Sequence, residues 1–103
     1  MGLGDSSRGP DEVLRELLNV ALRAGIQVRS EPLDPDLFER SRGGICRIEG
    51  VRTIVVDSSA PIEERIAVLL RALATVELDA VYMRPELRER IDRQKPVDQV
   101  KRA

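Results

Sequence analysis

The sequence predicts an α+β fold in which three helices pack on one face of a small, mainly antiparallel three-stranded sheet with a central β-hairpin. Two apolar stretches that meet at Gly50 predict the hairpin, because glycine supplies the positive φ that a two-residue turn requires. Three other stretches with apolar residues at helical spacing predict the helices. A chain of 103 residues is long enough for one hydrophobic core.

The domain is expected to span residues 10–94, between a flexible leader over residues 1–9 and a flexible tail over residues 95–103. The leader is rich in Gly and Ser, so it buries too little apolar surface to offset the entropy lost on ordering. The tail follows the point where Lys95 precedes Pro96, because a residue before proline disfavours the helical conformation.

The first helix is predicted to begin at Pro10 and to end at Gly25. Proline fits the first helical position, and Asp11 and Glu12 place negative charge near the positive end of the helix dipole. Gly25 fits the left-handed residue that commonly follows a helix.

Alternating apolar and polar residues over 26–30 predict a short, half-exposed strand, which is expected to be either an edge strand or a second-rank strand of the sheet. Prolines, aspartates and glycines over residues 31–44 then predict a loop, with one candidate helical turn at residues 36–40.

The turn of the hairpin is predicted at Glu49-Gly50 or at Gly50-Val51. A turn at Glu49-Gly50 sets the opposite pairs of the two strands, which are Ile48 with Val51, Arg47 with Arg52, Cys46 with Thr53, and Ile45 with Ile54. Like charges directly opposite each other destabilise a sheet, so Arg47 and Arg52 need screening by solvent or by Glu49. The alternative is that the two arginines contact a bound anion or an acidic partner.

Asp57 and Ser58 lie where the second hairpin strand leads into the next helix, which begins near Pro61. Asp and Ser before a helix are mostly turn and capping residues, so a serine here is expected to cap the helix. The alternative is a polar cluster in which Asp57 binds a hard cation with help from Glu63 or Glu64. The third helix is predicted to begin at Arg84-Pro85.

Cys46 is the single cysteine, so no disulfide forms within one chain and a reducing cytoplasm is favoured. Free cysteine is among the residue types most often buried, and Cys46 shares its face with Ile48, so we expect a small core residue. The alternative is a reactive thiol, with Arg47 or Arg52 stabilising its thiolate form.

The chain contains no histidine, which excludes the usual general base and the commonest metal ligand. No glycine-rich phosphate-binding loop is present either, so neither a metal site nor a cofactor is predicted. The net charge is −1 and no long run has one sign, which disfavours nucleic acid and anionic membranes as partners. No apolar run approaches the roughly 20 residues of a membrane-spanning helix.

The stretch Gly43-Gly44-Ile45-Cys46-Arg47-Ile48-Glu49-Gly50, with Ile54-Val55-Val56-Asp57 and Val81-Tyr82-Met83-Arg84-Pro85-Glu86-Leu87-Arg88, resembles small bacterial proteins with a Gly-Gly-x-Cys-Arg hairpin. The resemblance covers most of the chain after Pro10. It implies a bacterial, cytosolic protein of the same fold and assigns no activity or site.

The cysteine-bearing hairpin followed by a Pro-initiated helix is also similar to the start of the zinc peptidases that cleave phage-type repressors. Those enzymes carry His-Glu-x-x-His on the helix after the hairpin, where this chain has Arg71-Ala72-Leu73-Ala74-Thr75. The resemblance therefore implies a non-catalytic relative, and no functional residue is carried over.

The expected function is that of a small cytosolic interaction or regulatory domain that binds a protein partner or a second copy of itself, without catalysis. We expect its contact surface to be an apolar patch on the sheet face that bears Ile45 and Ile54. The alternative is a thiol-based redox sensor or an enzyme that uses Cys46 with Asp57, which requires these groups to converge in one cleft.

Overall fold

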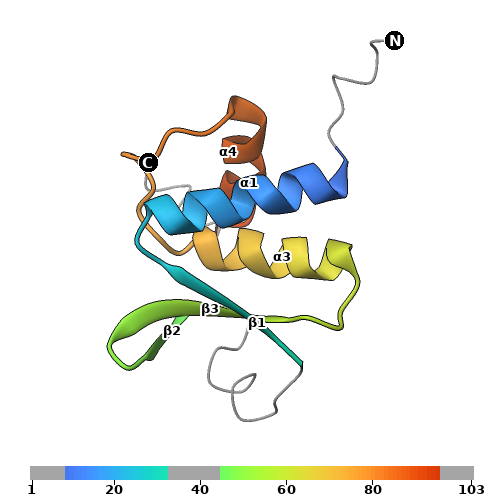
Figure 1. Cartoon of the computed structure of the whole chain (residues 1–103). Helices are drawn as coiled ribbons and strands as arrows, with labels where there is room; N and C mark the ends of the chain where they lie inside the picture. The colour runs from blue at the N-terminus through green and yellow to red at the C-terminus, as the bar shows by residue number, and fades with distance from the viewer. Residues whose placement is uncertain (1–8, 33–44, 96–103) are drawn as a thin grey trace.

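A computed structural model describes residues 9–32 and 45–95 of the chain (Figure 1). Within these residues the element order is α1 (Pro10–Arg23), β1 (Gln27–Glu31), β2 (Ile45–Ile48), β3 (Val51–Asp57), α3 (Ile62–Leu73) and α4 (Pro85–Asp92). Three helices and a three-stranded sheet confirm the predicted α+β class. The predicted helical turn at 36–40 lies outside the described residues, as do the predicted leader up to residue 8 and the predicted tail from residue 96.

The sheet has the order β1-β3-β2, so β3 is the central strand. β2 pairs with β3 in antiparallel orientation, whereas β1 pairs with β3 in parallel orientation. The prediction of a mainly antiparallel sheet is therefore wrong, because the sheet is mixed. Side-chain alternation in a strand is the same in both directions, so residues 26–30 indicate a half-exposed strand but not its direction. This strand lies at the edge of the sheet, which is one of its two expected positions.

The hairpin has its turn at Glu49-Gly50, and all four predicted opposite pairs are present. Glu49 has φ 54° and Gly50 has φ 82°, as in the two-residue turns that match the twist of a hairpin. Glycine adopts this conformation without strain, whereas Glu49 is a side-chain-bearing residue in the left-handed region.

α1 ends as its sequence predicts. Gly25 has φ 79° and its N–H donates to the Leu22 carbonyl at 3.0 Å, while the N–H of Ile26 donates to the Ala21 carbonyl at 2.9 Å. These two bonds form a Schellman motif, which satisfies helix carbonyls that otherwise have no partner. Ile26 and Ala21 are both buried, so the motif also directs the chain from α1 into β1.

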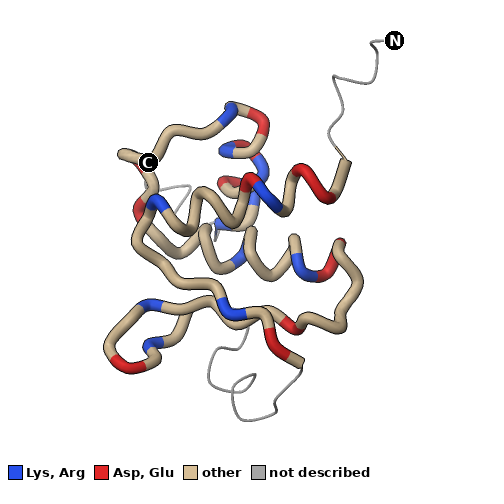
Figure 2. The backbone as a smooth tube through the Cα atoms, viewed as in Figure 1, with Lys and Arg blue, Asp and Glu red and all other residues tan. Residues whose placement is uncertain are grey.

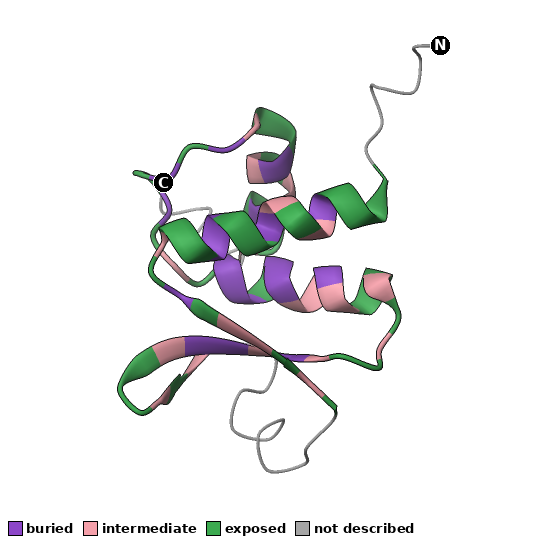
Figure 3. Cartoon of the chain, in the orientation of Figure 1, coloured by how far each residue is buried: buried purple, intermediate pink, exposed green. Residues whose placement is uncertain are grey.

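α1 and α3 lie side by side on one face of the sheet, and each contacts a strand (Figure 1). α4 packs mainly against α3 and lies farther from the sheet than α3 does. Figure 3 shows that the buried segments of α1, α3 and β3 gather where the helices meet the sheet. The largest fully buried side chains of the described residues are five apolar ones and one threonine, which are Leu17, Ile54, Leu69, Leu73, Ile91 and Thr53.

In the view of Figure 2, basic and acidic residues are interspersed along the helices and the hairpin. Among the described residues, no helix is both long enough and apolar enough to cross a membrane.

Candidate functional site

Arg47 and Arg52 are directly opposite each other on β2 and β3, as predicted, but each guanidinium has its own carbonyl acceptor. Arg52 Nη2 donates to the Ala24 carbonyl at 3.0 Å, and Arg47 Nη1 donates to the Gly50 carbonyl at 3.2 Å. Ala24 caps the C-terminal end of α1, where the helix dipole favours positive charge. The like charges are therefore accommodated by backbone carbonyls, which neither of the predicted explanations included.

Cys46 lies on the face of the sheet that points away from the helices. It is directly opposite Thr53, whereas Arg52, Ile54 and Val56 alternate to the helix-facing side. Cys46 is half-buried, and it is not part of the core between helices and sheet. Neither Arg47 nor Arg52 shares its face, so the predicted stabilisation of a thiolate by these side chains has no geometric basis.

Asp57 and Ser58 form a turn rather than a helix cap. Asp57 Oδ1 accepts hydrogen bonds from the Ser59 N–H at 3.0 Å and from Ser59 Oγ at 2.7 Å. The residue that precedes α3 is Pro61, and no side chain caps that helix. The prediction of a serine cap is therefore wrong, because α3 begins at Ile62 and both serines lie before its N-cap residue, where Ser59 bonds to Asp57 instead.

The groups required by an enzyme or a redox site do not converge. Cys46 is opposite Thr53, and Asp57 follows Thr53 by four residues on the same strand, which corresponds to about 13 Å at the usual rise of a strand. No group of three or more Cys, Asp or Glu side chains within residues 9–32 and 45–95 is placed to hold a metal ion.

The sheet face that bears Ile45 and Ile54 is covered by the helices. Ile54 is fully buried and Ile45 packs against the core. The predicted apolar contact patch on this face is therefore absent, because this face is the one on which α1 and α3 pack.

A groove lies elsewhere on the surface, between the outer side of α1 and the chain that leads into α4. Its volume is about 170 Å³, and it is lined by Glu16, Asn19, Val20, Arg23, Tyr82, Met83, Arg84 and Leu87. Its floor is apolar, since Val20, Met83 and Leu87 are all buried. Tyr82, at its edge, is 77% exposed.

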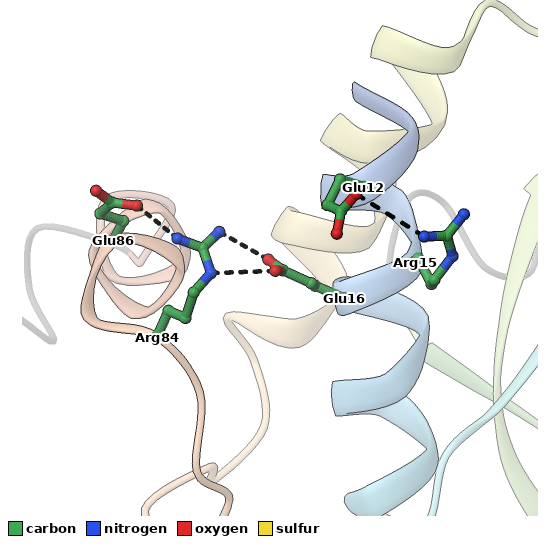
Figure 4. Close-up of polar contacts among 5 residues, drawn as sticks. All are labelled: Glu12, Arg15, Glu16, Arg84 and Glu86. Atoms are coloured by element: carbon green, nitrogen blue, oxygen red, sulfur yellow. Dashed lines mark hydrogen bonds and ion pairs between the residues drawn. The ribbon is translucent and has the colours of Figure 1, made fainter. Parts of the chain in front are cut away.

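Two of the lining residues, Glu16 and Arg84, belong to an ion-pair network that also includes Glu86 (Figure 4). Arg84 donates to both carboxylate oxygens of Glu16, with Nη2 to Oε1 at 2.7 Å and Nε to Oε2 at 3.1 Å, and its Nη1 reaches Glu86 Oε1. The Glu16 hydrogen bonds are the main cause that raises the pKa of Arg84 above its ordinary value. The network joins α1 to the start of α4, so the two sides of the groove are held together.

The segment that carries Tyr82 is fixed from the other side by Arg88. Its Nη2 donates to the Val81 carbonyl at 2.7 Å and to the Leu78 carbonyl at 3.3 Å. The groove is therefore built from a helix and a loop that is anchored by Arg88.

Three polar groups of the groove make no hydrogen bond or ion pair within the described part of the chain, and they are Asn19, Arg23 and Tyr82. Reasoning from the sequence identified none of these residues. Two signals were present, which are an aromatic residue in an extended segment and an arginine in the last turn of α1. The pairing of Glu16 with Arg84, 68 positions apart, has no local sequence signal.

No model of a known protein family, no curated protein and no solved structure matches this chain.

Proposed function

We propose that this chain is a small, non-catalytic interaction domain that binds a protein partner through the groove between α1 and α4. We further propose that it acts in the cytoplasm, because a chain with a single cysteine forms no internal disulfide and suits a reducing compartment. The observation that carries the proposal is Tyr82, a large aromatic side chain that is 77% exposed beside an apolar floor. Exposed aromatic residues next to an apolar pocket are typical of the residues that dominate binding at protein interfaces.

The rigidity of the groove supports this proposal. The Arg84–Glu16 bonds and the Arg88 bonds to two carbonyls hold both sides in place before a partner arrives. A preformed surface loses little conformational entropy on binding. For the same small contact area, it therefore binds more tightly than a mobile surface does.

The distribution of reactive groups supports a function without catalysis. Cys46 and Asp57 are far apart along the sheet, and the last turn of α3 contributes buried Ala72 and Leu73 to the core. We further propose, from the resemblance of the hairpin and the following helix alone, that the chain is a non-catalytic relative of the repressor-cleaving peptidases, with this turn in place of their metal-binding turn.

A second copy of the chain is the alternative partner, because β2 is an edge strand of the sheet. An edge strand has backbone groups on one side that are able to pair with another strand. Sedimentation of the Tyr82→Ser variant separates the two modes, since a dimer through β2 is retained and one through the groove is lost.

The proposal is tested by quantitative affinity capture with the full chain from extracts of the source cell. Tyr82→Ser is compared with Val51→Ser, which removes an exposed apolar residue from the hairpin, away from α4 (Figure 1). We expect specific proteins to be retained by the original chain and by Val51→Ser, and to be lost with Tyr82→Ser. Equal retention by all three, or no retained protein, contradicts the proposal.

A further inference from the structure

We infer that the groove between α1 and α4 recognises an acidic peptide segment that carries one bulky apolar anchor residue. This inference rests on the proposed function, because it names the chemistry of the partner at the same site. It is carried by the size of the groove, by the pairing of its charged residues Glu16 and Arg84, and by an arginine among its lining residues that is unpaired within the described residues.

The size of the groove favours a single side chain as the buried part of the ligand. Its volume of about 170 Å³ is below the roughly 300–1,000 Å³ typical of sites for small molecules and cofactors. The floor formed by Val20, Met83 and Leu87 is apolar, so the side chain that enters is apolar as well. Tyr82 adds an aromatic surface beside that floor, against which a leucine or an aromatic ring packs.

The charges on the walls disfavour a basic ligand. Glu16 is the acidic residue that lines the groove, and both of its carboxylate oxygens accept hydrogen bonds from Arg84. A lysine or arginine of a ligand would have to compete with this bidentate pair, which is a strong form of ion pair. Arg84 is in turn occupied by Glu16 and Glu86, so it is not available to an incoming anion.

Arg23 is the charged lining residue that remains available. It ends α1, and it makes no ion pair or hydrogen bond within the described residues. A guanidinium presents several donors in a plane and binds a carboxylate with two parallel bonds. An acidic residue next to the anchor is therefore the complement of Arg23, while the anchor occupies the floor.

The recognition is local rather than the result of long-range attraction. The whole chain has a net charge of −1, so it does not steer acidic partners from a distance. We therefore expect affinity to depend on the anchor and on Arg23, with only modest dependence on salt.

The test is a titration of the isotope-labelled full chain with three synthetic seven-residue peptides, followed by NMR. The first peptide has Asp and Glu on both sides of a central Leu, the second has Lys and Arg in place of the acids, and the third has Ser in place of the Leu. We expect the first peptide to shift the amide signals of Asn19, Tyr82 and Leu87, and to bind at least about tenfold more tightly than the other two.

Arg23→Gln and its control Arg71→Gln complete the test. Both arginines are exposed and lie in the last turn of a helix, but Arg71 belongs to α3 and does not line the groove. Loss of a charge-assisted hydrogen bond predicts about tenfold weaker binding of the acidic peptide by Arg23→Gln, with no change for Arg71→Gln.

The inference is overturned by equal binding of the acidic and basic peptides, by equal binding of the peptide without its anchor, or by the absence of any shift at the groove with an acidic peptide. It is also overturned if a partner captured through Tyr82 is insensitive to Arg23→Gln, and in that case the proposed function stands. If the captured proteins are retained by Tyr82→Ser as well, the proposed function itself is rejected.

Discussion

Arg52, near the start of the central strand β3, donates a hydrogen bond from Nη2 to the carbonyl of Ala24, the residue that caps α1, at 3.0 Å. This bond joins two segments 28 positions apart, and it places a half-buried cation at the negative end of a helix dipole. Replacement by Met removes the donor while keeping the apolar stem. We expect the free energy of unfolding of Arg52→Met, measured by urea denaturation, to fall by about 1.5 kcal/mol.

Arg47→Met is the matched control, because Arg47 is directly opposite and its bond to Gly50 is exposed. We expect a change within about 0.5 kcal/mol for this variant. Equal losses for both variants would show that the contact with Ala24 adds no stability beyond that of a surface bond.

The turn of the hairpin contains a strained residue that substitution is expected to improve. Glu49 has φ 54°, which asparagine adopts more readily than glutamate. We expect Glu49→Asn to raise the free energy of unfolding by about 0.5 kcal/mol.

Gly50→Ala should have the opposite effect, lowering stability by about 1 kcal/mol. No atom lies within 4 Å of an added Cβ at Gly50, so the loss arises from φ 82° and not from a clash. If neither Glu49→Asn nor Gly50→Ala changes the free energy of unfolding, the left-handed conformation of this turn is contradicted.

The ion pair between Glu16 and Arg84 is expected to couple α1 to α4. Its two hydrogen bonds and its partial burial predict a coupling energy of about 1 kcal/mol in a double-mutant cycle with Glu16→Gln and Arg84→Met. The control is the Glu12–Arg15 pair on α1, which is longer at 3.9 Å and more exposed (Figure 4). Its expected coupling is at most about 0.3 kcal/mol.

The pH dependence of this coupling follows from the direction of the Arg84 shift. Its pKa is raised in the folded state, chiefly by the Glu16 bonds, so the stabilisation is complete below the unfolded pKa and is lost only as pH rises through the folded pKa. Both values lie above the range of about pH 6 to 10, so the loss of Arg84 charge does not change the coupling there. A decrease of the coupling energy between about pH 6 and 10 would contradict the assignment of this coupling to the charged form of Arg84.

Cys46 is expected to be replaceable without loss of fold or binding. It is half-buried on the face away from the helices, so Cys46→Ser should change the free energy of unfolding by less than about 1 kcal/mol. Capture through the groove should be the same with and without a thiol oxidant. A partner that is released on oxidation of the original chain, but not of Cys46→Ser, would restore the redox alternative.

The features that the sequence predicts correctly are the local ones. The hairpin register and the ends of α1 followed from Gly50, Pro10 and Gly25, because each fixes the backbone through its own conformational limits. The direction of β1 was not predictable, because alternation does not encode it. Alternation also does not encode which face of the sheet the helices cover. The expected apolar patch was therefore assigned to a face that is buried.

The candidate site could not be predicted because it is formed by side chains that are distant in sequence. Glu16 and Arg84 are separated by 68 positions, and neither lies in a recognisable motif. The residues that the sequence did indicate, Cys46, Arg47 and Asp57, are brought to different faces or ends of the sheet. A pattern in one stretch reports its own conformation, whereas a groove depends on how helices pack.

Arg88 is expected to control the shape of the groove without lining it. It lies on α4, and its Nη2 bonds to the carbonyls of Leu78 and Val81 hold the segment that presents Tyr82. Arg88→Met should lower the free energy of unfolding by about 1 kcal/mol, because two half-buried carbonyls lose their charged donor. Arg90→Met, on the same helix and without a hydrogen bond in the described residues, is the control and should change stability by less than about 0.5 kcal/mol. Hydrogen exchange gives the sharper measurement, since Arg88→Met should speed exchange at the Val81 amide, whose bond to the Leu78 carbonyl closes this turn. If the Val81 amide exchanges equally in Arg88→Met and Arg90→Met, the segment is held by its buried side chains Leu78, Val81 and Met83 and not by the guanidinium.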